Sequence, residues 1–237
     1  YFTVTAGGGT VQNANVVTDY NGYVETLWQL GSQFGIQTLE AKAKKADGSL
    51  IQNAPIEFTA TIQSDSTFTD PRDGQIYTFR HIGNQVWMTK NLNYATSGSW
   101  CYDNNIANCA NYGYLYDWNT ALTVAPPGWH LPSYAEWINL INFLGGELVA
   151  GGKMKSTTGW IAPNTGATNS SGFAGLPGGA LYGNGLFGGI GGYGYWWSSA
   201  AYLSLSAYYC NLTYDSAKVN FTTINKTTRY SVRCVRN

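Results

Sequence analysis

The chain has 237 residues, which is long enough for two domains of ordinary size. Charged residues make up 11% of the sequence and balance to a formal net charge of zero, so bulk charge gives no reason to expect a nucleic-acid partner or an anionic membrane surface. No apolar run approaches the roughly 20 residues of a membrane-spanning helix. With 29 glycines and 15% aromatic residues, we expect a β-rich protein. We also expect it to be a monomer and not to insert directly into a membrane.

Residues 1 to 64 alternate apolar and polar side chains over short runs. YFTVTA, YVETLWQL, IQTLEAKAK and IEFTATI are separated by turn signals such as GGG and DYNG. This alternation predicts a small antiparallel β-sandwich. The order TAGGGTV, TDYNGYVETLWQLG, GIQTLEAKA resembles the bacterial immunoglobulin-like repeats of invasin and intimin-type surface proteins.

That resemblance implies that the first two strands of the N-terminal domain are missing, because they would precede Tyr1. A chain that begins at Tyr1 rather than Met is expected to be an excised piece. Either the missing strands lie upstream in a parent protein, or the half-sandwich leaves a sheet edge that something must cover. Residues 65 to 71 are polar and end at Pro71, which predicts a linker.

Local signals in residues 72 to 237 predict a hairpin and two helices. Gly83 and Asn84 join two alternating runs, GQIYTFRHI and QVWMTKNL, as in a β-hairpin. In LPSYAEWINLINFLGG, Ser133 and Glu136 form a capping-box pattern, and apolar residues recur at helical spacing as far as the stop signal Gly145. A shorter helix is predicted over GYLYDWNTAL. Residues 175 to 194 are glycine-dense and are predicted to be a structured, self-packed loop region rather than a free linker.

Seven sequence blocks in this part keep a common order and spacing. They are DGQIYTFRHIGNQVWMTKNLNY, CYDNNIANCANYGYLYDW, PPGWHLPSYAEW, KMKSTTGW, SGFAGLPGG, YWWSSA and YSVRCV. In these blocks the chain resembles the Fibrobacter succinogenes major paralogous domain. The resemblance implies an α+β C-type-lectin-like domain over residues 72 to 237, in the branch that also holds the formylglycine-generating enzymes. An immunoglobulin-like module followed by such a domain is also the tip arrangement of the invasin and intimin adhesins.

The four cysteines favour an oxidising, extracytoplasmic location. Cys101 and Cys109 flank a short polar loop that a disulfide can close. The resembled family usually has a cysteine where this chain has Ala125, and that cysteine would be expected to pair with Cys234. Two alternatives therefore stay open. Cys210 and Cys234 pair if their strands are neighbours, or both remain free thiols.

The last forty residues carry a biased composition. Half of them are Ser, Thr, Tyr or Asn. The C-type-lectin-like class also contains the targets of diversity-generating retroelements, whose adenine-directed substitutions near the C-terminus would produce such a bias. Several residues of this segment, including Tyr208 and Leu212, match the family pattern and are expected to be scaffold. The nonmatching positions are Tyr202, Leu203, Leu205, Tyr209, Thr213, Asp215, Ser216, Phe221, Thr222, Thr223, Ile224, Thr227, Thr228 and Arg229.

Because fixed and free positions alternate, we expect the free ones to share a single exposed face. Such a face would bind as an antibody paratope does, with aromatic contact area and adaptable hydroxyl and amide groups. The alternative is a solvated sheet face that contains good strand formers and nothing more.

Catalysis and metal binding find less support in the sequence. His130 lies in the structural block GWHLP, and no Ser/His/Asp order with an elbow motif is present. Cys210 and Cys234 do not correspond to a transferable motif of the formylglycine-generating branch. GNGLFG and GIGGYG lack the strand and helix context of a dinucleotide site. Asp103 and its neighbouring amides lack the spacing of a calcium loop, so we expect no cofactor and no metal.

The sequence therefore predicts a secreted or surface-displayed bacterial module for ligand binding and adhesion, without enzymatic activity. Its ligand would be a protein or a glycan on another cell or phage, and retroelement diversification would vary the contact face. One alternative is a lectin whose Trp and Tyr rings stack on sugars. Others are a redox or hydrolytic enzyme and a structural surface-layer protein.

Overall fold

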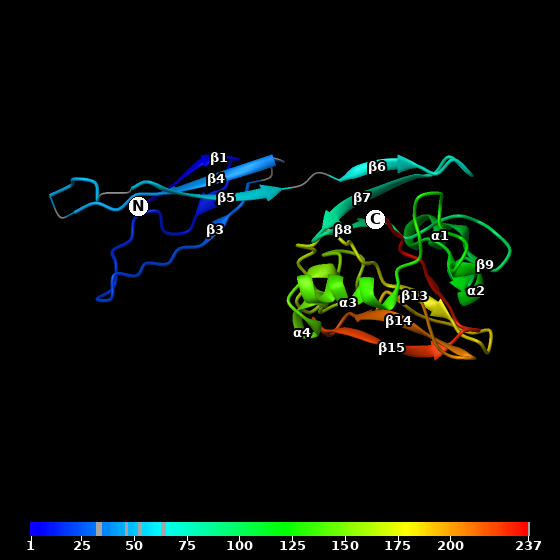
Figure 1. Cartoon of the computed structure of the whole chain (residues 1–237). Coiled ribbons are helices and arrows are strands. Elements are labelled where there is room, and N and C mark those ends of the chain that lie inside the picture. The colour runs from blue at the N-terminus through cyan, green and yellow to red at the C-terminus, as the bar shows by residue number, and fades with distance from the viewer. Residues whose placement is uncertain (32–34, 46, 52–53, 63–64, 237) are drawn as a thin grey trace. The chain divides into compact units, whose positions relative to one another are not determined.

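The computed structural model describes residues 1–31, 35–45, 47–51, 54–62 and 65–236. Contacts within the chain divide it into two compact units, Tyr1–Ser64 and Asp65–Asn237, which are drawn in Figure 1 and described separately below. Residues 64 and 237, the last residues of the two predicted domains, lie outside the described residues.

The first unit contains two small antiparallel sheets. One has the strand order β1 (Phe2–Ala6), β4 (Gly35–Ala41) and β5 (Ile56–Ile62), and the other pairs β2 (Thr10–Val11) with β3 (Trp28–Gln29).

The larger of these sheets has one apolar face. Register places Val4 and Phe58 on either side of Leu39, so that the three side chains share that face. Leu39 is buried, whereas Phe58 on the outer strand β5 remains half-exposed. Gln37 is buried beside Leu39, and its side-chain amide donates a hydrogen bond to the carbonyl of Gly31 and accepts one from its N–H.

The second unit begins with a four-stranded sheet of order β17 (Val235–Arg236), β8 (Gln85–Met88), β7 (Ile76–Ile82) and β6 (Ser66–Thr69). The hairpin predicted at Gly83 is confirmed, because β7 and β8 pair up to Ile82 and Gln85 on either side of that turn. The predicted linker is corrected, since most of residues 65 to 71 form strand β6. Phe68 supplies the physical reason, because its ring packs 5.3 Å from that of Trp129.

An eight-stranded sheet makes up most of the second unit. Its main path is β12 (Phe187–Ile190), β11 (Gly178–Leu181), β16 (Arg229–Ser231), β13 (Tyr193–Leu203), β14 (Ser206–Thr213) and β15 (Val219–Asn225). β10 (Leu115–Asp117) pairs with β16 and with β9 (Ser99–Trp100). The glycine-dense region is structured, as predicted, but it is not a loop throughout, because β11 and β12 pair there as a hairpin.

The helices of the second unit are short. They are α1 (Ile106–Tyr112), α2 (Trp118–Ala121), α3 (Tyr134–Phe143) and α4 (Glu147–Met154), with one 3-10 turn, η1 (Tyr102–Asn104). The capping box of α3 is confirmed, because Ser133 Oγ accepts a hydrogen bond from the Glu136 N–H and the Glu136 carboxylate accepts one from the Ser133 N–H. Trp137 lies on the buried face of α3.

The expected α+β class is wrong. The described residues form seventeen strands and four α-helices, of which the longest has ten residues. Frequent glycines divide the sequence into short runs with period-two alternation, and few stretches are long enough for a helical face. The composition correctly predicts a β-rich protein.

The eight-stranded sheet separates two apolar cores. Trp196 and Trp197 are neighbours on β13 and point to opposite faces, as alternation along a strand requires. Trp196 packs with Trp137 of α3 in one core, and Trp197 packs with Tyr230 of β16 in the other. Figure 1 shows β13, β14 and β15 side by side in this unit, with α3 beside them.

Candidate contact surface

The β13–β14 hairpin ends in three exposed apolar side chains. Tyr202, Leu203 and Leu205 are 55%, 63% and 71% exposed. We call residues 202–205 the hairpin tip. Lys226, in the turn between β15 and β16, holds the main chain of the tip in place, because it donates hydrogen bonds from its N–H to the Leu205 carbonyl and from Nζ to the Ser204 carbonyl. The main chain of the tip is thus anchored while its apolar side chains face solvent.

Four aromatic rings form a continuous cluster beside this tip. The ring centroid of Tyr208 lies 5.5 Å from Tyr202, 5.8 Å from Phe221 and 4.9 Å from Tyr134. Tyr134 also lies 5.1 Å from Phe221. We call these four residues the aromatic surface. Tyr134 and Tyr202 are 43% and 55% exposed, and the other two rings are half-buried.

Strand register explains why these rings meet. Tyr208 lies directly opposite Thr223, and Cys210 lies opposite Phe221, so all four side chains point to the α3 face of the sheet. Phe221 packs on Trp137, with centroids 6.4 Å apart. The capping box begins α3 at Tyr134, which places that ring over the end of the same face.

The phenol groups of the aromatic surface are not used in the hydrogen bonding of the fold. In the part of the chain that the structure describes, the hydroxyls of Tyr134, Tyr202 and Tyr208 have no hydrogen-bond partner within the protein. Each ring thus offers apolar contact area and one unused donor and acceptor.

The predicted contact residues do not share a single face. Thr222 and Ile224 lie opposite Tyr209 and Ala207, on the side of β14 and β15 away from α3. Tyr209 packs 4.9 Å from Tyr230. Burial raises the pKa of the Tyr209 hydroxyl. Tyr209 and Ile224 therefore pack against the second core, whereas Thr222 on the same face is exposed.

Three more predicted residues lie at the other end of β14. Thr213 donates a hydrogen bond from Oγ1 to Asp215, at 2.7 Å. The buried ammonium of Lys155 donates hydrogen bonds to the carbonyls of Thr213, Ser216 and Thr165. These contacts fix the β14–β15 turn, which is separated from the hairpin tip by the length of the strand.

The last predicted residues surround the β15–β16 turn. Thr227 is exposed, whereas Thr228 is only 4% exposed and belongs to the scaffold. The Arg229 guanidinium lies over the Trp100 ring, 4.7 Å from its centroid. The structure thus places Tyr202, Leu203 and Leu205 at the hairpin tip, and Phe221 and Thr223 on the α3 face of the sheet. The remaining nine lie on the opposite face of the sheet or in and around the β14–β15 and β15–β16 turns.

Sequence reasoning missed two members of the aromatic surface. Tyr208 matches the family pattern and is therefore expected in the scaffold, and Tyr134 is not among the predicted contact residues. Tyr208 lies two residues from Cys210 on β14 and therefore shares a sheet face with Cys210 and with Phe221 opposite it. Recognising this requires knowledge of the strand register. No local pattern connects Tyr134 to residues more than seventy positions away.

The cysteines separate into one disulfide and two buried thiols. Cys101 and Cys109 form the predicted disulfide. Of the two open alternatives for Cys210 and Cys234, the structure has free thiols, because Cys210 points into the α3 core and Cys234 into the other. Burial raises the pKa of Cys234 to about 12 and raises that of Cys210 further, so neither thiol is activated as a nucleophile.

A cleft of about 520 Å³ lies beside the disulfide and is lined by Asn91, Asn93 and Tyr112, among other residues. Its polar side chains are largely engaged within the protein. The Asn91 oxygen accepts hydrogen bonds from Trp196 Nε1 and Arg233 Nη2, and its amide nitrogen donates to the Tyr112 carbonyl. The hydrogen bonds of Asn91 therefore stabilise the core.

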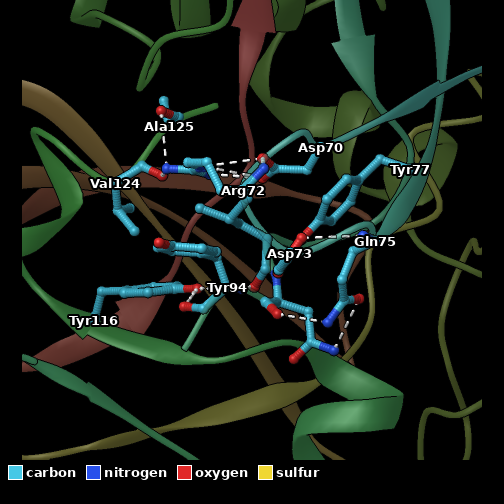
Figure 2. Close-up of polar contacts among 11 residues, drawn as sticks. Asp70, Arg72, Asp73, Gln75, Tyr77, Tyr94, Tyr116, Val124 and Ala125 are labelled. Atoms are coloured by element: carbon cyan, nitrogen blue, oxygen red, sulfur yellow. Dashed lines mark hydrogen bonds and ion pairs between the residues drawn. The ribbon is translucent and has the colours of Figure 1, made fainter. Parts of the chain in front are cut away.

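Figure 2 shows a second polar network, around Asp70 and Arg72, together with Gln75 and Tyr77 from the lining of the cleft. Arg72 donates hydrogen bonds from Nε and Nη2 to the carboxylate of Asp70 and one from Nη1 to the Val124 carbonyl, and its guanidinium lies 4.0 Å from the Tyr94 ring centroid. Burial opposes ionisation of Asp70, but the hydrogen bonds and charge of Arg72 outweigh it and hold the pKa of Asp70 below its usual value. The network ties three segments of the fold together.

The remaining ionisable groups show no arrangement for metal chemistry. Within the described ranges, no group of three or more His, Cys, Asp and Glu residues could hold a metal ion. His130 Nε2 lies 2.7 Å from Glu136 Oε1, and Glu136 caps α3, so this pair serves the start of the helix. The part of the chain described here also has no helix long and apolar enough to cross a membrane.

Comparison with known proteins gives one family. Residues 81–236 match the model of the Fibrobacter succinogenes major domain. No curated protein and no solved structure matches the chain. Because the match covers well over half of its length, this chain belongs to the Fibrobacter succinogenes major domain family.

Proposed function

We propose that this protein is a ligand-binding module of the bacterial cell surface that recognises a protein partner through the hairpin tip and the aromatic surface. The observation that carries the proposal is the cluster of Tyr134, Tyr202, Tyr208 and Phe221, which is partly exposed and adjoins three exposed apolar side chains. Contiguous exposed apolar groups of this kind mark interaction sites on proteins.

The composition of this surface suits recognition of a protein. Tyrosine is enriched at interface hot spots because a rigid ring supplies a large contact area at small entropic cost. Leu203 and Leu205 add apolar area without hydrogen-bonding groups, which favours a protein partner over a sugar. The proposal assigns binding and adhesion to the molecule and no chemical step.

Retroelement diversification is a further part of the proposal. The side chains of Tyr202, Leu203 and Leu205 extend from a hairpin whose main chain is held by β-pairing and by Lys226. Substitutions there would alter contacts and leave the scaffold in place. The genomic test is a near-identical copy of the last forty codons that differs at adenines and lies beside a reverse transcriptase gene. A locus without such a copy would contradict diversification.

The binding test compares two triple variants of the whole chain against a panel of purified bacterial surface proteins. The tip variant is Tyr202→Ser, Leu203→Ser, Leu205→Ser. The control replaces three other exposed apolar residues of the same unit with Ser, at Ile106, Phe143 and Ile161. We expect the tip variant to bind at least about tenfold more weakly than the control, which is a typical loss for hot-spot residues.

Equal binding by both variants would contradict the proposal. A glycan array provides the comparison with a lectin function. One dominant sugar that depends on the aromatic rings would support a carbohydrate ligand instead.

A further inference from the structure

Strand β15 is an open edge of the eight-stranded sheet. It is the last strand in the sheet order and pairs with β14 alone. Seven consecutive residues, Val219 to Asn225, pair with β14 without a register shift. The outer strands β12 and β6 of the same unit have four residues each. Among the described edges of this unit, β15 therefore offers the longest regular template.

The phase of the hydrogen bonds shows which main-chain groups face outward. Lys226 donates its N–H to the Leu205 carbonyl. Hydrogen-bonded pairs alternate along an antiparallel ladder, so Thr222 and Ile224 bond to β14, whereas the N–H and C=O groups of Phe221 and Thr223 point away from it. Throughout the described part of the chain, no other group hydrogen-bonds these outward groups of Phe221 and Thr223.

The edge lacks the features that usually protect such strands. Natural edge strands carry charges, proline or bulges, or are very short. Residues 219–225 contain no charged residue and no proline, and no bulge interrupts their pairing. A regular, uncharged edge of this length is suited to adding a further strand.

The surroundings of the edge indicate which side chains an added strand would carry. On the α3 face the edge adjoins Phe221 and the rest of the aromatic surface, which favours apolar residues at alternate positions. Near the start of β15 lies a hollow of about 360 Å³ whose lining includes Glu147, Lys218 and Thr222. This hollow would accept one side chain of the incoming strand.

Charge argues against a second copy of this chain as the occupant. Full antiparallel pairing of β15 with another β15 would place Lys218 opposite Lys226 of the second copy, at both ends of the pair. Like charges directly opposite each other destabilise a strand pair. A different segment with an acidic residue at each end would face the same two lysines favourably.

We propose that β15 accepts an extended segment of a partner protein as an added antiparallel strand, with apolar residues at alternate positions and acidic residues at both ends. This inference rests on the proposed function in taking the ligand to be a protein, and it supplies the binding mode. Affinity comes from the main chain of Phe221 and Thr223, and the aromatic surface and the hollow select the side chains.

The first test is hydrogen–deuterium exchange on the whole chain with a synthetic peptide, Glu-Val-Thr-Val-Thr-Val-Thr-Val-Glu, whose two glutamates are spaced to lie opposite Lys226 and Lys218. The control peptide has proline at the fourth residue, opposite Thr223, which removes an amide donor to β15 and blocks strand pairing. In the free protein, the amides of Phe221 and Thr223 should exchange faster than those of Thr222 and Ile224. The first peptide should slow exchange at Phe221 and Thr223, and the proline peptide should not. Unchanged exchange at a saturating concentration of the first peptide overturns the inference.

The second test compares Thr223→Pro with Thr223→Ala. Both remove the hydroxyl, but only proline removes the outward N–H, a position where an edge strand tolerates proline. Thr223→Pro should weaken peptide binding at least about tenfold relative to Thr223→Ala. Equal binding by the two variants overturns strand addition, whereas the hairpin-tip variant decides the proposed function separately. If Thr223→Pro does not fold, the exchange experiment on the unmodified chain decides.

Discussion

Tyr208 and Phe221 stack almost in parallel on neighbouring strands, with ring centroids 5.8 Å apart and an interplanar angle of 5°. Phe221 continues inward to the ring of Trp137, whereas Tyr208 continues outward to that of Tyr202. The pair therefore joins the α3 core to the exposed hairpin tip. Ring contact of this kind restricts the orientation of the exposed tyrosines.

The two ends of this ring series should differ in their effect on stability. Phe221→Ala removes a half-buried ring that packs on the core, so the free energy of unfolding should fall by about 2 kcal/mol. Tyr202→Ala truncates an exposed side chain and should change it by less than about 0.5 kcal/mol. Urea unfolding of the two variants measures both values. Equal losses would show that the hairpin tip is part of the core.

Replacing Asp70 by Asn should destabilise the fold strongly. Asp70 is buried and accepts hydrogen bonds from two nitrogens of Arg72, so its loss leaves the guanidinium without a carboxylate partner. Breaking a buried ion pair at one partner typically costs about 3 kcal/mol. Chemical unfolding at neutral pH measures this loss, and Asp73→Asn, on an exposed neighbour, is the control. Similar stabilities of the two variants would contradict a structural role of the pair.

The same pair predicts how stability depends on acid. The folded-state pKa of Asp70 lies below its usual value, so its contribution is complete above the unfolded pKa of about 3.9 and is lost as pH falls through the lower folded value. Urea midpoints should therefore fall as the pH decreases below about 4, and less steeply in Asp70→Asn than in the unmodified chain. Parallel curves for the two proteins would show that other carboxylates carry the dependence.

The disulfide should contribute measurable stability. Cys101 and Cys109 are eight residues apart, and closing a loop of this length restricts the unfolded chain by about 2 to 3 kcal/mol. The double variant Cys101→Ser, Cys109→Ser should lose that amount in urea unfolding. Adding reductant should lower the unfolding midpoint of the unmodified chain and leave that of the double variant unchanged. A reductant effect on the double variant would implicate another bond.

The two free thiols should be unreactive in the folded protein. Cys210 and Cys234 are fully buried, and burial raises the pKa of Cys234 to about 12. A thiol reagent at neutral pH should label neither cysteine in the native protein and both in denaturant. Rapid labelling of Cys210 in native protein would instead revive the redox alternative.

The sequence by itself determined the features whose interactions are local. The Gly83 hairpin, the capping box of Ser133 and Glu136, and the Cys101–Cys109 disulfide each join residues less than ten positions apart. Their geometry follows from turn preference, helix capping and a short loop, none of which depends on the rest of the chain. The β-rich composition was also readable without coordinates.

Tertiary structure decided the position of the contact surface. The aromatic surface joins Tyr134 of a helix to Tyr208 and Phe221 of two strands, and the face to which a strand residue points depends on register with its neighbours. That register separates Phe221 from Tyr209, although both lie in one predicted set. Short-range patterns could not foresee it, because cross-strand pairing and core packing connect residues that the sequence keeps far apart.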